Sequence, residues 1–358
     1  MLTMKKKILL ITSRADHGGG PKHILNILEH LGGDFAFFIA CPNDYPYYQL
    51  FKKYGPCFYI PHRQISLASI IYLLKKIEKE KIDLIHSHGR GAGLYSRILG
   101  LITKRTVIHT FHGVHYAHLS ISAKFIYINL ERLLSMFTDA YINVTKSEQA
   151  ECRKARLFPE RKSVIISNAV DIPEHYTRVR EKVKFNIINV SRIAFEKGSD
   201  ILLEIAYYLL KLTSNFKLII VGNGEFKKKM QEKIKIMHLE EYVILLGFRN
   251  DINEHLKSAD IYISSSRGEA QGIAVLEAMS WAMPVIVSNV IGHIDIVRHG
   301  YNGYLFDLSK PMDAARYLYQ LMNDEAMYKT MSINNYNYVS ENYSMQKMCE
   351  SIKKVYLQ

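Results

Sequence analysis

Residues 267–279 read RGEAQGIAVLEAM, and this stretch carries the most information about the fold. The run ADIYISSS at 259–266 predicts a strand followed by a loop, and the segment from Ile273 onward predicts the start of a helix. Glu269 would then lie in the loop, and Glu277 on the second turn of the helix. Open parallel sheets bind ligands just beyond the carboxyl ends of their strands, so we expect both acids beside a ligand cleft.

The residues between these acids indicate the kind of ligand. Gly272 lets the backbone N–H groups of Gly272, Ile273 and Ala274 approach an anion at the N-terminus of the helix. The carboxylates of Glu269 and Glu277 accept hydrogen bonds from hydroxyl groups. An anionic group next to hydroxyl groups describes a sugar nucleotide.

The composition predicts two domains with very different charge. The chain has 358 residues, of which 48% are hydrophobic, and this is enough for two cores. Residues 1–170 hold 24 Lys+Arg against 12 Asp+Glu, whereas residues 171–358 hold 23 against 22. A half with a net charge of +12 favours a polyanionic partner: anionic lipid, a phosphorylated acceptor or nucleic acid. A generally basic proteome would explain the same charge.

Neither cysteine pattern nor hydropathy indicates secretion or a membrane span. Cys41, Cys57, Cys152 and Cys349 form no CxxC pair, which favours a reduced, cytoplasmic setting. The N-terminal MLTMKKKILLITSR has an apolar run too short for a signal peptide and is interpreted as a first strand. No window of about 18 uncharged apolar residues occurs, so any membrane contact would be peripheral.

Strand-like and helix-like segments alternate along the chain, which predicts two parallel, doubly wound sheets. The boundary is expected in the polar stretch at 168–184, and the chain is expected to be helical after Pro311. The strand-like runs are KILLI, FAFFIA, DLIHSH, TVIHTFH, AYINVT and SVIIS in the first half, then FNIINVS, KLIIVG, YVILLG, IYISSS and PVIVS. The amphipathic stretches include 23–31, 67–81, 200–212 and 225–237.

Three strand ends carry further candidate binding residues. Gly18 and Gly19, in SRADHGGGP, permit close approach of a phosphate or sugar, although a tight turn alone would explain them equally well. Arg192 and Lys197, in SRIAFEKG, would stabilise a departing diphosphate; the alternative is that Lys197 is a solvated loop charge. Gly222, in VGNGE, is a weak candidate for a phosphate turn because the third glycine of a nucleotide fingerprint is missing.

Histidines gather in DLIHSHG, which contains His86 and His88, and in HTFHG, which contains His109 and His112. A metal site is one interpretation, with His115 and His118 nearby. Each cluster instead ends a strand at a glycine, and the chain has no HExxH, carboxylate triad or Asp-x-Asp. We therefore expect no metal, and expect His112 rather than His86 to meet a sugar or an acceptor.

Apolar and basic residues are combined at 67–81 and 116–140. Helices that face the core and carry solvated cations are the ordinary explanation. Together with the charge of the first half, contact with an anionic leaflet is the alternative.

Motifs in this order and spacing resemble the retaining glycosyltransferases of family 4, over nearly the whole chain. Those enzymes have the α/β GT-B architecture: two facing Rossmann-like, doubly wound parallel-sheet domains with an interdomain cleft. The resemblance implies an N-terminal acceptor-binding domain at 1–168 and a nucleotide-sugar-binding domain at 169–341, with a final helix at about 342–358 that packs back on the first domain. The segments that carry it are Gly18-Gly19 with His23, DLIHSH, HTFHG, SNAVD, SRIAFEKG, VGNGE, LLGF and EAQGIAVLEAM.

The resemblance also implies a role for individual residues. Glu277 is similar to the acid that binds the ribose, and Glu269 to the acid that contacts the transferred sugar. Arg192 and Lys197 resemble the pair that binds the diphosphate. The remaining implied contacts are a backbone amide at Gly19 from the first domain, His112 to the sugar, the amides of Gly272, Ile273 and Ala274 to phosphate or sugar, and Phe248 with Arg249 to the base.

Some positions depart from the family pattern. Ala270 and Gln271 replace a glycine and an aromatic residue, so a more polar sugar pocket is expected, the identity of the donor is left open, and these two residues are the first candidates for determining donor specificity. Asp295 stands where many members have glutamate, and Ala169 replaces a common glycine. None of these changes removes a charged catalytic group.

The implied activity is that of a hexosyltransferase: transfer of a sugar, with retention, from a UDP- or GDP-sugar to a hydroxyl group, with UDP favoured and no metal or other cofactor. The basic first half suggests a polyanionic lipid-linked saccharide or lipopolysaccharide acceptor, used in surface polysaccharide biosynthesis at the inner face of the cytoplasmic membrane. Three alternatives are open: a small soluble acceptor, a nucleotide-sugar epimerase, and a non-catalytic protein that binds membrane or nucleic acid.

Overall fold

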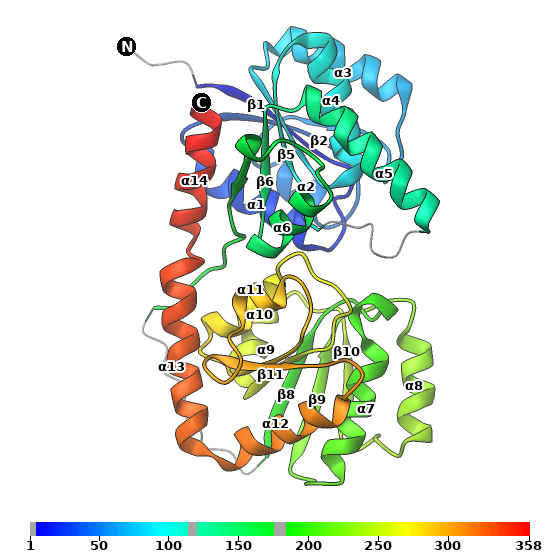
Figure 1. Ribbon diagram of the computed structural model, residues 1–358, viewed down its shortest axis with the longest axis vertical. Coiled ribbons are helices and arrows are strands. Elements are labelled where there is room, and N and C mark those ends of the chain that lie inside the picture. The colour runs from blue at the N-terminus through cyan, green and yellow to red at the C-terminus, as the bar shows by residue number, and fades with distance from the viewer. Residues whose placement is uncertain (1–4, 114–119, 175–183) are drawn as a thin grey trace. The chain divides into compact units, whose positions relative to one another are not determined.

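The computed structural model describes residues 5–113, 120–174 and 184–358 (Figure 1). It divides into two compact units, and each is described by itself. Unit 1 consists of Met1–Asn168 together with Met345–Gln358, and unit 2 is Ala169–Ser344. His115 and His118 lie outside the described residues, as does part of the boundary expected at 168–184.

Unit 1 has a sheet whose described part contains seven parallel strands in the order β3-β2-β1-β4-β5-β6-β7. Ile8, Leu9, Leu10 and Ile11 of β1 are all fully buried, as expected for a parallel strand covered by helices on both faces. The strands are β1 (Lys7–Thr12), β2 (Ala36–Cys41), β3 (Cys57–Tyr59), β4 (Leu84–His88), β5 (Thr106–Thr110), β6 (Ala140–Asn143) and β7 (Ser163–Ile165).

The helices of unit 1 include one from the far end of the chain. Tyr356 of this last helix forms a hydrogen bond of 2.7 Å with Nδ1 of the buried His86, and Lys6 Nζ donates to the carbonyl oxygen of Tyr356. The helices are α1 (Gly19–Leu31), α2 (Tyr47–Phe51), α3 (Leu67–Glu80), α4 (Arg90–Thr103), α5 (Ile121–Leu134), α6 (Lys146–Lys154) and α14 (Met345–Leu357), with 3-10 turns η1 (Ser135–Phe137) and η2 (Glu160–Lys162).

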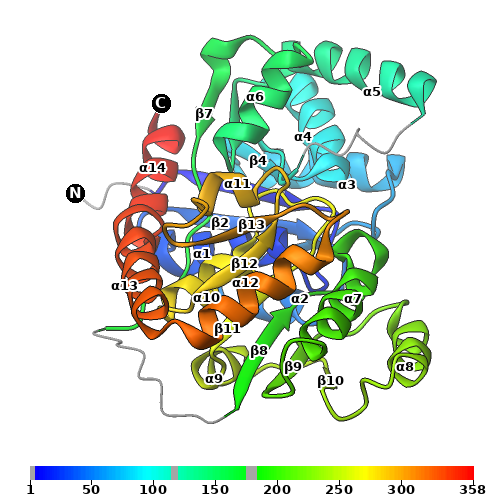
Figure 2. The same cartoon turned by 60° about the horizontal axis from the view of Figure 1, so that its bottom comes forward.

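Unit 2 has six parallel strands within its described residues, in the order β10-β9-β8-β11-β12-β13 (Figure 2). The strands are β8 (Phe185–Val190), β9 (Phe216–Val221), β10 (Val243–Gly247), β11 (Ile261–Ser264), β12 (Val285–Ser288) and β13 (Gly303–Phe306). The helices are α7 (Ser199–Leu210), α8 (Lys227–Ile236), α9 (Ile252–Ser258), α10 (Ile273–Ser280), α11 (His293–Ile296), α12 (Pro311–Asn323) and α13 (Glu325–Asn342), with the 3-10 turn η3 (Phe195–Lys197).

The direction of winding reverses once in each sheet, between β1 and β4 in unit 1 and between β8 and β11 in unit 2. At such a point the loops that leave the two neighbouring strands diverge to opposite faces and form a crevice. The loops after β8 and β11 are those that contain Lys197 and Glu269.

Two doubly wound parallel sheets, as predicted, are therefore present. The structure adds the short strands β3 and β13, and it starts α1 at Gly19, before the amphipathic stretch at 23–31. After Pro311 the chain forms three successive helices, α12, α13 and α14. In the part of the chain that is described, no helix combines the length and the apolar character needed to cross a membrane.

Candidate active site

The loops after β8 and β11 are joined by an ion pair between two predicted site residues. Lys197 Nζ lies 2.5 Å from Glu269 Oε1, and the Ser266 hydroxyl donates to the same oxygen at 2.8 Å. The side chains remain partly accessible, with 26% of Lys197 and 17% of Glu269 exposed. One ammonium N–H of Lys197 is directed at Glu269, so the others are geometrically able to meet a further anion.

Electrostatics keep Glu269 ionised. Burial by itself would raise the pKa of Glu269, but the Lys197 ammonium, the nearby His293 and the two hydrogen bonds outweigh it and lower the pKa below its ordinary value. The carboxylate is therefore charged at neutral pH, and it can accept hydrogen bonds from hydroxyl groups but cannot serve as a general acid.

Arg192 is placed differently from Lys197. Its guanidinium pairs with Glu196, four residues later, and 45% of its side chain is exposed. The structure thus brings Lys197 and Glu269 together, whereas Arg192 is held by a neighbour on its own loop. A diphosphate would have to draw Arg192 away from Glu196.

Helix α10 begins at the position where the sequence predicts an anion-binding turn. Gly272 has φ of 82°, a left-handed conformation that favours glycine. A Cβ atom on Gly272 would lie 3.2 Å from Cδ2 of His293, so the approach is close as well. Ile273 and Ala274 supply the first amides of the helix, which have no carbonyl partner within it.

His293, to which the sequence assigned no role, packs against the turn at Gly272. Its Nδ1 lies 3.0 Å from the carbonyl oxygen of Ser288, which assigns the proton to Nδ1. Burial lowers the pKa of His293, although the charge of Glu269 opposes this shift. The signal available in the sequence was its place after Gly292, directly beyond β12.

Glu277 lies on the second turn of α10, as predicted, and is close enough to Tyr262 to act on it electrostatically, as Glu269 does. Tyr262 of β11 lies within electrostatic range of both acids. Burial raises the pKa of its phenol, and the charges of Glu269 and Glu277 raise this pKa further. Tyr262 donates to the carbonyl oxygen of Val190 at the end of β8. It thereby links the two strands whose loops carry Lys197 and Glu269, another contribution that the sequence did not reveal.

Two further predicted contacts lie on neighbouring strands of unit 2. Gly222 follows β9 with φ of 144°, and a Cβ atom there would lie 1.9 Å from the carbonyl oxygen of Ser191. This close approach makes glycine necessary whether or not a phosphate binds. Phe248 and Arg249 follow β10 and are both exposed.

In unit 1, Gly18 and Gly19 stand at the start of α1, and His112 follows β5. His112 has φ of 56°, a conformation uncommon outside glycine, and its Nε2 lies 3.1 Å from Nδ1 of His88. The next turn is held by Glu148, a buried acid on α6 that accepts from the amides of Gly113 and Val144. Sequence reasoning did not identify Glu148.

The histidines of unit 1 also approach the spacing of a metal site. His23, His88 and His112 each offer a nitrogen, and these atoms lie within 4.8 Å of one another. Burial lowers the pKa of His23 to about 4 and that of His88 well below its ordinary value, so both rings are neutral. Asp16, Asp44 and His62 form a second group of this kind, but Asp16 pairs with Arg14 and Asp44 with His62.

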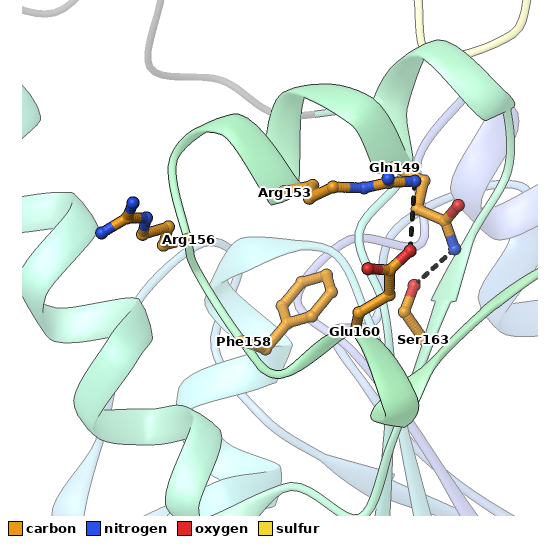
Figure 3. A pocket seen from close by; sticks show the side chains of 6 residues that line it. All are labelled: Gln149, Arg153, Arg156, Phe158, Glu160 and Ser163. Atoms are coloured by element: carbon orange, nitrogen blue, oxygen red, sulfur yellow. Dashed lines mark hydrogen bonds and ion pairs between the residues drawn. The ribbon is translucent and has the colours of Figure 1, made fainter.

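A small open hollow of about 130 Å³ lies at the surface of unit 1, away from these residues (Figure 3). Arg153 pairs with Glu160 across it at 3.2 Å, and Gln149 donates to Ser163 at 2.9 Å. Four of its polar side chains are thus paired with one another, and none of the predicted site residues lines it.

Solved structures with the same architecture identify the fold. A crystal structure of Anabaena Alr3699/HepE in complex with UDP and glucose aligns with a TM-score of 0.87, over 99% of this chain and 100% of that chain, at 19% identity. The crystal structure of TarM aligns with a TM-score of 0.80, over 100% and 99% of the two chains, at 15% identity. The fold is that of the GT-B glycosyltransferases, and the fold prediction is confirmed.

Two family models identify the family. Residues 17–174 match Glycosyltransferase Family 4, and residues 174–338 match Glycosyl transferases group 1. The chain belongs to family 4 of the glycosyltransferases and is an enzyme of that kind.

Two similar relatives are named for a diphosphoundecaprenol acceptor and for capsular polysaccharide biosynthesis. The chain is 29% identical over 322 residues to the UDP-Gal:alpha-D-GlcNAc-diphosphoundecaprenol alpha-1,3-galactosyltransferase of Escherichia coli, covering 84% of this chain and 83% of the relative. It is 23% identical to the capsular polysaccharide biosynthesis glycosyltransferase CapM of Staphylococcus aureus, covering 81% and 80%.

Proposed function

We propose that this glycosyltransferase moves a sugar, with retention of anomeric configuration, from a UDP-sugar to a hydroxyl group of a lipid-linked saccharide or lipopolysaccharide acceptor. The observation that carries the proposal is the ion pair of Lys197 with Glu269 beside the N-terminus of α10. A cation, first-turn amides and an ionised acid gathered at the carboxyl ends of parallel strands suit a diphosphate next to a sugar.

Each charged residue then has a role in the transfer. Lys197 and Arg192 stabilise the negative charge that grows on the diphosphate as the glycosidic bond breaks. Glu269 accepts hydrogen bonds from the transferred sugar, and Glu277 from the ribose. His112, Gly18 and Gly19 are the residues of unit 1 proposed to contact the donor, with Phe248 and Arg249 proposed for the base.

No side-chain nucleophile is needed in this scheme. The departing phosphate oxygen takes the proton of the acceptor hydroxyl while the new bond forms on the same face of the sugar. Glu269 is held ionised by Lys197, which suits a hydrogen-bond acceptor rather than a proton donor. The reaction is proposed to need no metal.

Support for the acceptor comes from charge and from the names of relatives. One relative is named for a diphosphoundecaprenol acceptor and another for capsular polysaccharide biosynthesis. An acceptor of that kind is anionic and bound to a membrane, which fits a chain with 24 basic and 12 acidic residues in positions 1–170. We accordingly place the enzyme in surface polysaccharide assembly, in peripheral contact with the inner face of the cytoplasmic membrane.

The test is to incubate the purified full chain with UDP-, GDP- and ADP-sugars, with and without an undecaprenyl-diphosphate-linked saccharide. We expect turnover of a UDP-sugar that depends on the acceptor, and NMR of the product should show the anomeric configuration of the donor. An inverted product would contradict retention. Turnover without any acceptor, giving an isomeric nucleotide sugar, would instead indicate an epimerase.

Variants separate a transferase from a protein that only binds. Lys197→Met should abolish most of the turnover, whereas Lys211→Met, an exposed lysine at the end of α7, should match the wild type. Steep salt-dependent binding to duplex DNA without turnover of any donor would favour the nucleic-acid alternative. Transfer to a water-soluble sugar at a rate equal to that for the lipid-linked one would favour a small soluble acceptor.

A further inference from the structure

The outward side of α5 in unit 1 is apolar. Ile121 is 91% exposed, Phe125 70% and Ile126 65%. Leu130, Leu133 and, just beyond the helix, Met136 are exposed as well. We call these six residues the α5 outer face. Surface helices of globular proteins normally present polar residues to water, so the pattern indicates a partner.

The orientation of this helix is held by buried contacts on its other side. Tyr127, Glu131 and Leu134 form the inward stripe, with the spacing of a helix that packs along one side. Arg97 of α4 is completely buried and donates to Glu131 at 3.1 Å. The guanidinium of Arg90 lies 4.6 Å from the centre of the Tyr127 ring.

These contacts prevent α5 from hiding its apolar side. Turning the helix inward would separate Arg97 from Glu131 and leave a buried charge without its partner, a strongly unfavourable change. Figures 1 and 2 both show α5 at the outer edge of unit 1. The apolar residues are thus fixed in an exposed position.

The charges on α5 identify the partner as anionic. Three residues of the helix are charged, and the carboxylate of Glu131 is the buried one. Lys124 and Arg132 are exposed, so every charge that α5 presents to solvent is positive. Two copies of the chain meeting through this face would bring these cations together, whereas an anionic bilayer would attract them.

We infer that the α5 outer face inserts among the headgroups of an anionic bilayer, with Phe125 and Ile126 at the centre of the contact. The inference rests on the proposed function, because an enzyme with a membrane-bound acceptor must reach the membrane surface. Insertion also changes the expected salt dependence of membrane binding. Attraction of the basic unit alone would be abolished by salt, whereas insertion of apolar side chains is only weakly sensitive to salt.

The experiment measures sedimentation of the full chain with vesicles of phosphatidylcholine, with and without phosphatidylglycerol, at low and high salt. The test variant carries Phe125→Ser and Ile126→Ser, which remove apolar surface and leave the charge unchanged. The matched control carries Ile236→Ser and Ile333→Ser, which remove exposed isoleucines from unit 2. Thermal unfolding and UDP-sugar hydrolysis in the absence of vesicles verify that each variant is folded.

We expect the wild type and the control to bind the anionic vesicles and to remain partly bound at high salt. The test variant should bind at least about tenfold more weakly, with unchanged unfolding temperature and hydrolysis. Equal binding by the test variant and the wild type would overturn the inference, as would complete release of the wild type by salt or equal binding to vesicles without phosphatidylglycerol.

The outcomes also separate this inference from the proposed function and from self-association. Vesicle binding through α5 by a chain that turns over no UDP-sugar would remove the proposed function and leave the membrane contact. Turnover of a UDP-sugar by a chain that does not bind vesicles would overturn the membrane contact and leave the proposed function. A wild type that forms dimers without lipid, beside a monomeric test variant, would assign the α5 outer face to a second copy and overturn the inference.

Discussion

Lys197 Nζ lies 2.5 Å from Glu269 Oε1, although 72 residues separate them in the chain. The contact exists because β8 and β11 are neighbours at the point where the winding of the unit 2 sheet reverses. Residues from two distant loops are therefore held in one place by the order of the strands.

Lys197 and Glu277 should affect different kinetic constants. Lys197→Met is expected to lower kcat by about 10²- to 10³-fold, because it removes a charge that stabilises the departing diphosphate. Glu277→Gln is expected to raise KM for the donor by about tenfold with a smaller effect on kcat, because it weakens binding of the ribose in both ground and transition states. Steady-state kinetics at saturating acceptor check this, and an equal loss of both constants in the two variants would contradict the assigned roles.

Acid should destabilise the enzyme partly through His23. Burial lowers its pKa from 6.5 to about 4 in the folded state, so between these values the unfolded chain binds a proton that the folded chain does not. Stability attributable to the neutral ring is therefore complete above pH 6.5 and is lost as the pH falls to about 4, by about 3 kcal/mol. His23→Gln should reduce this loss in the free energy of unfolding measured with urea.

The control for that experiment lies on the same helix. His30 is exposed near the end of α1, and His30→Gln should reproduce the pH profile of the wild type. Parallel profiles for His23→Gln and the wild type would contradict the prediction, because they would show that folding does not change the protonation of His23.

Chelation should leave transfer unchanged. The proposed transition state is stabilised by Lys197, Arg192 and backbone amides, so EDTA is expected to have no effect on kcat. The test is informative because His23, His88 and His112 are spaced closely enough to hold a metal ion. Loss of activity in EDTA that is restored by Zn²⁺ in the wild type, but not in His23→Gln, would assign a metal to those histidines.

The last helix should contribute measurably to the stability of unit 1. Tyr356→Phe removes the hydroxyl that bonds to Nδ1 of His86 in a fully buried position, and it is expected to lower the free energy of unfolding by about 1–3 kcal/mol. Tyr319→Phe, on the partly exposed α12, should change it by less than about 0.5 kcal/mol. Denaturant unfolding of both variants would reveal whether the bond matters.

Much of the fold could be predicted because the strands are long enough and apolar enough to be recognised. The segment around β11 and α10 is the clearest case, since the helix begins at Ile273 and places Glu277 on its second turn. The short strands were not predicted: β3 covers Cys57–Tyr59 and has no periodicity of its own. Such a strand is defined by its pairing with β2, which the local sequence does not encode.

The candidate site was predicted as a set of residues but not as a set of contacts. The sequence placed Arg192 and Lys197 together, whereas in the structure Arg192 pairs with Glu196 and Lys197 with Glu269. Tyr262 and His293 were missed because their importance arises from what lies across the sheet from them. The assigned roles in catalysis stay predictions until the variants are measured.

Unit 1 is assembled from the two ends of the chain, since Met345–Gln358 joins Met1–Asn168 after the whole of unit 2. Tyr356 forms a hydrogen bond with His86 and an edge-to-face ring contact with Phe35. During synthesis these two contacts can form only after Tyr356 has been added to the chain. The half of the protein that is made first is thus completed last. A chain that stops before Met345 would therefore lose part of unit 1, although the missing residues follow unit 2 in the sequence.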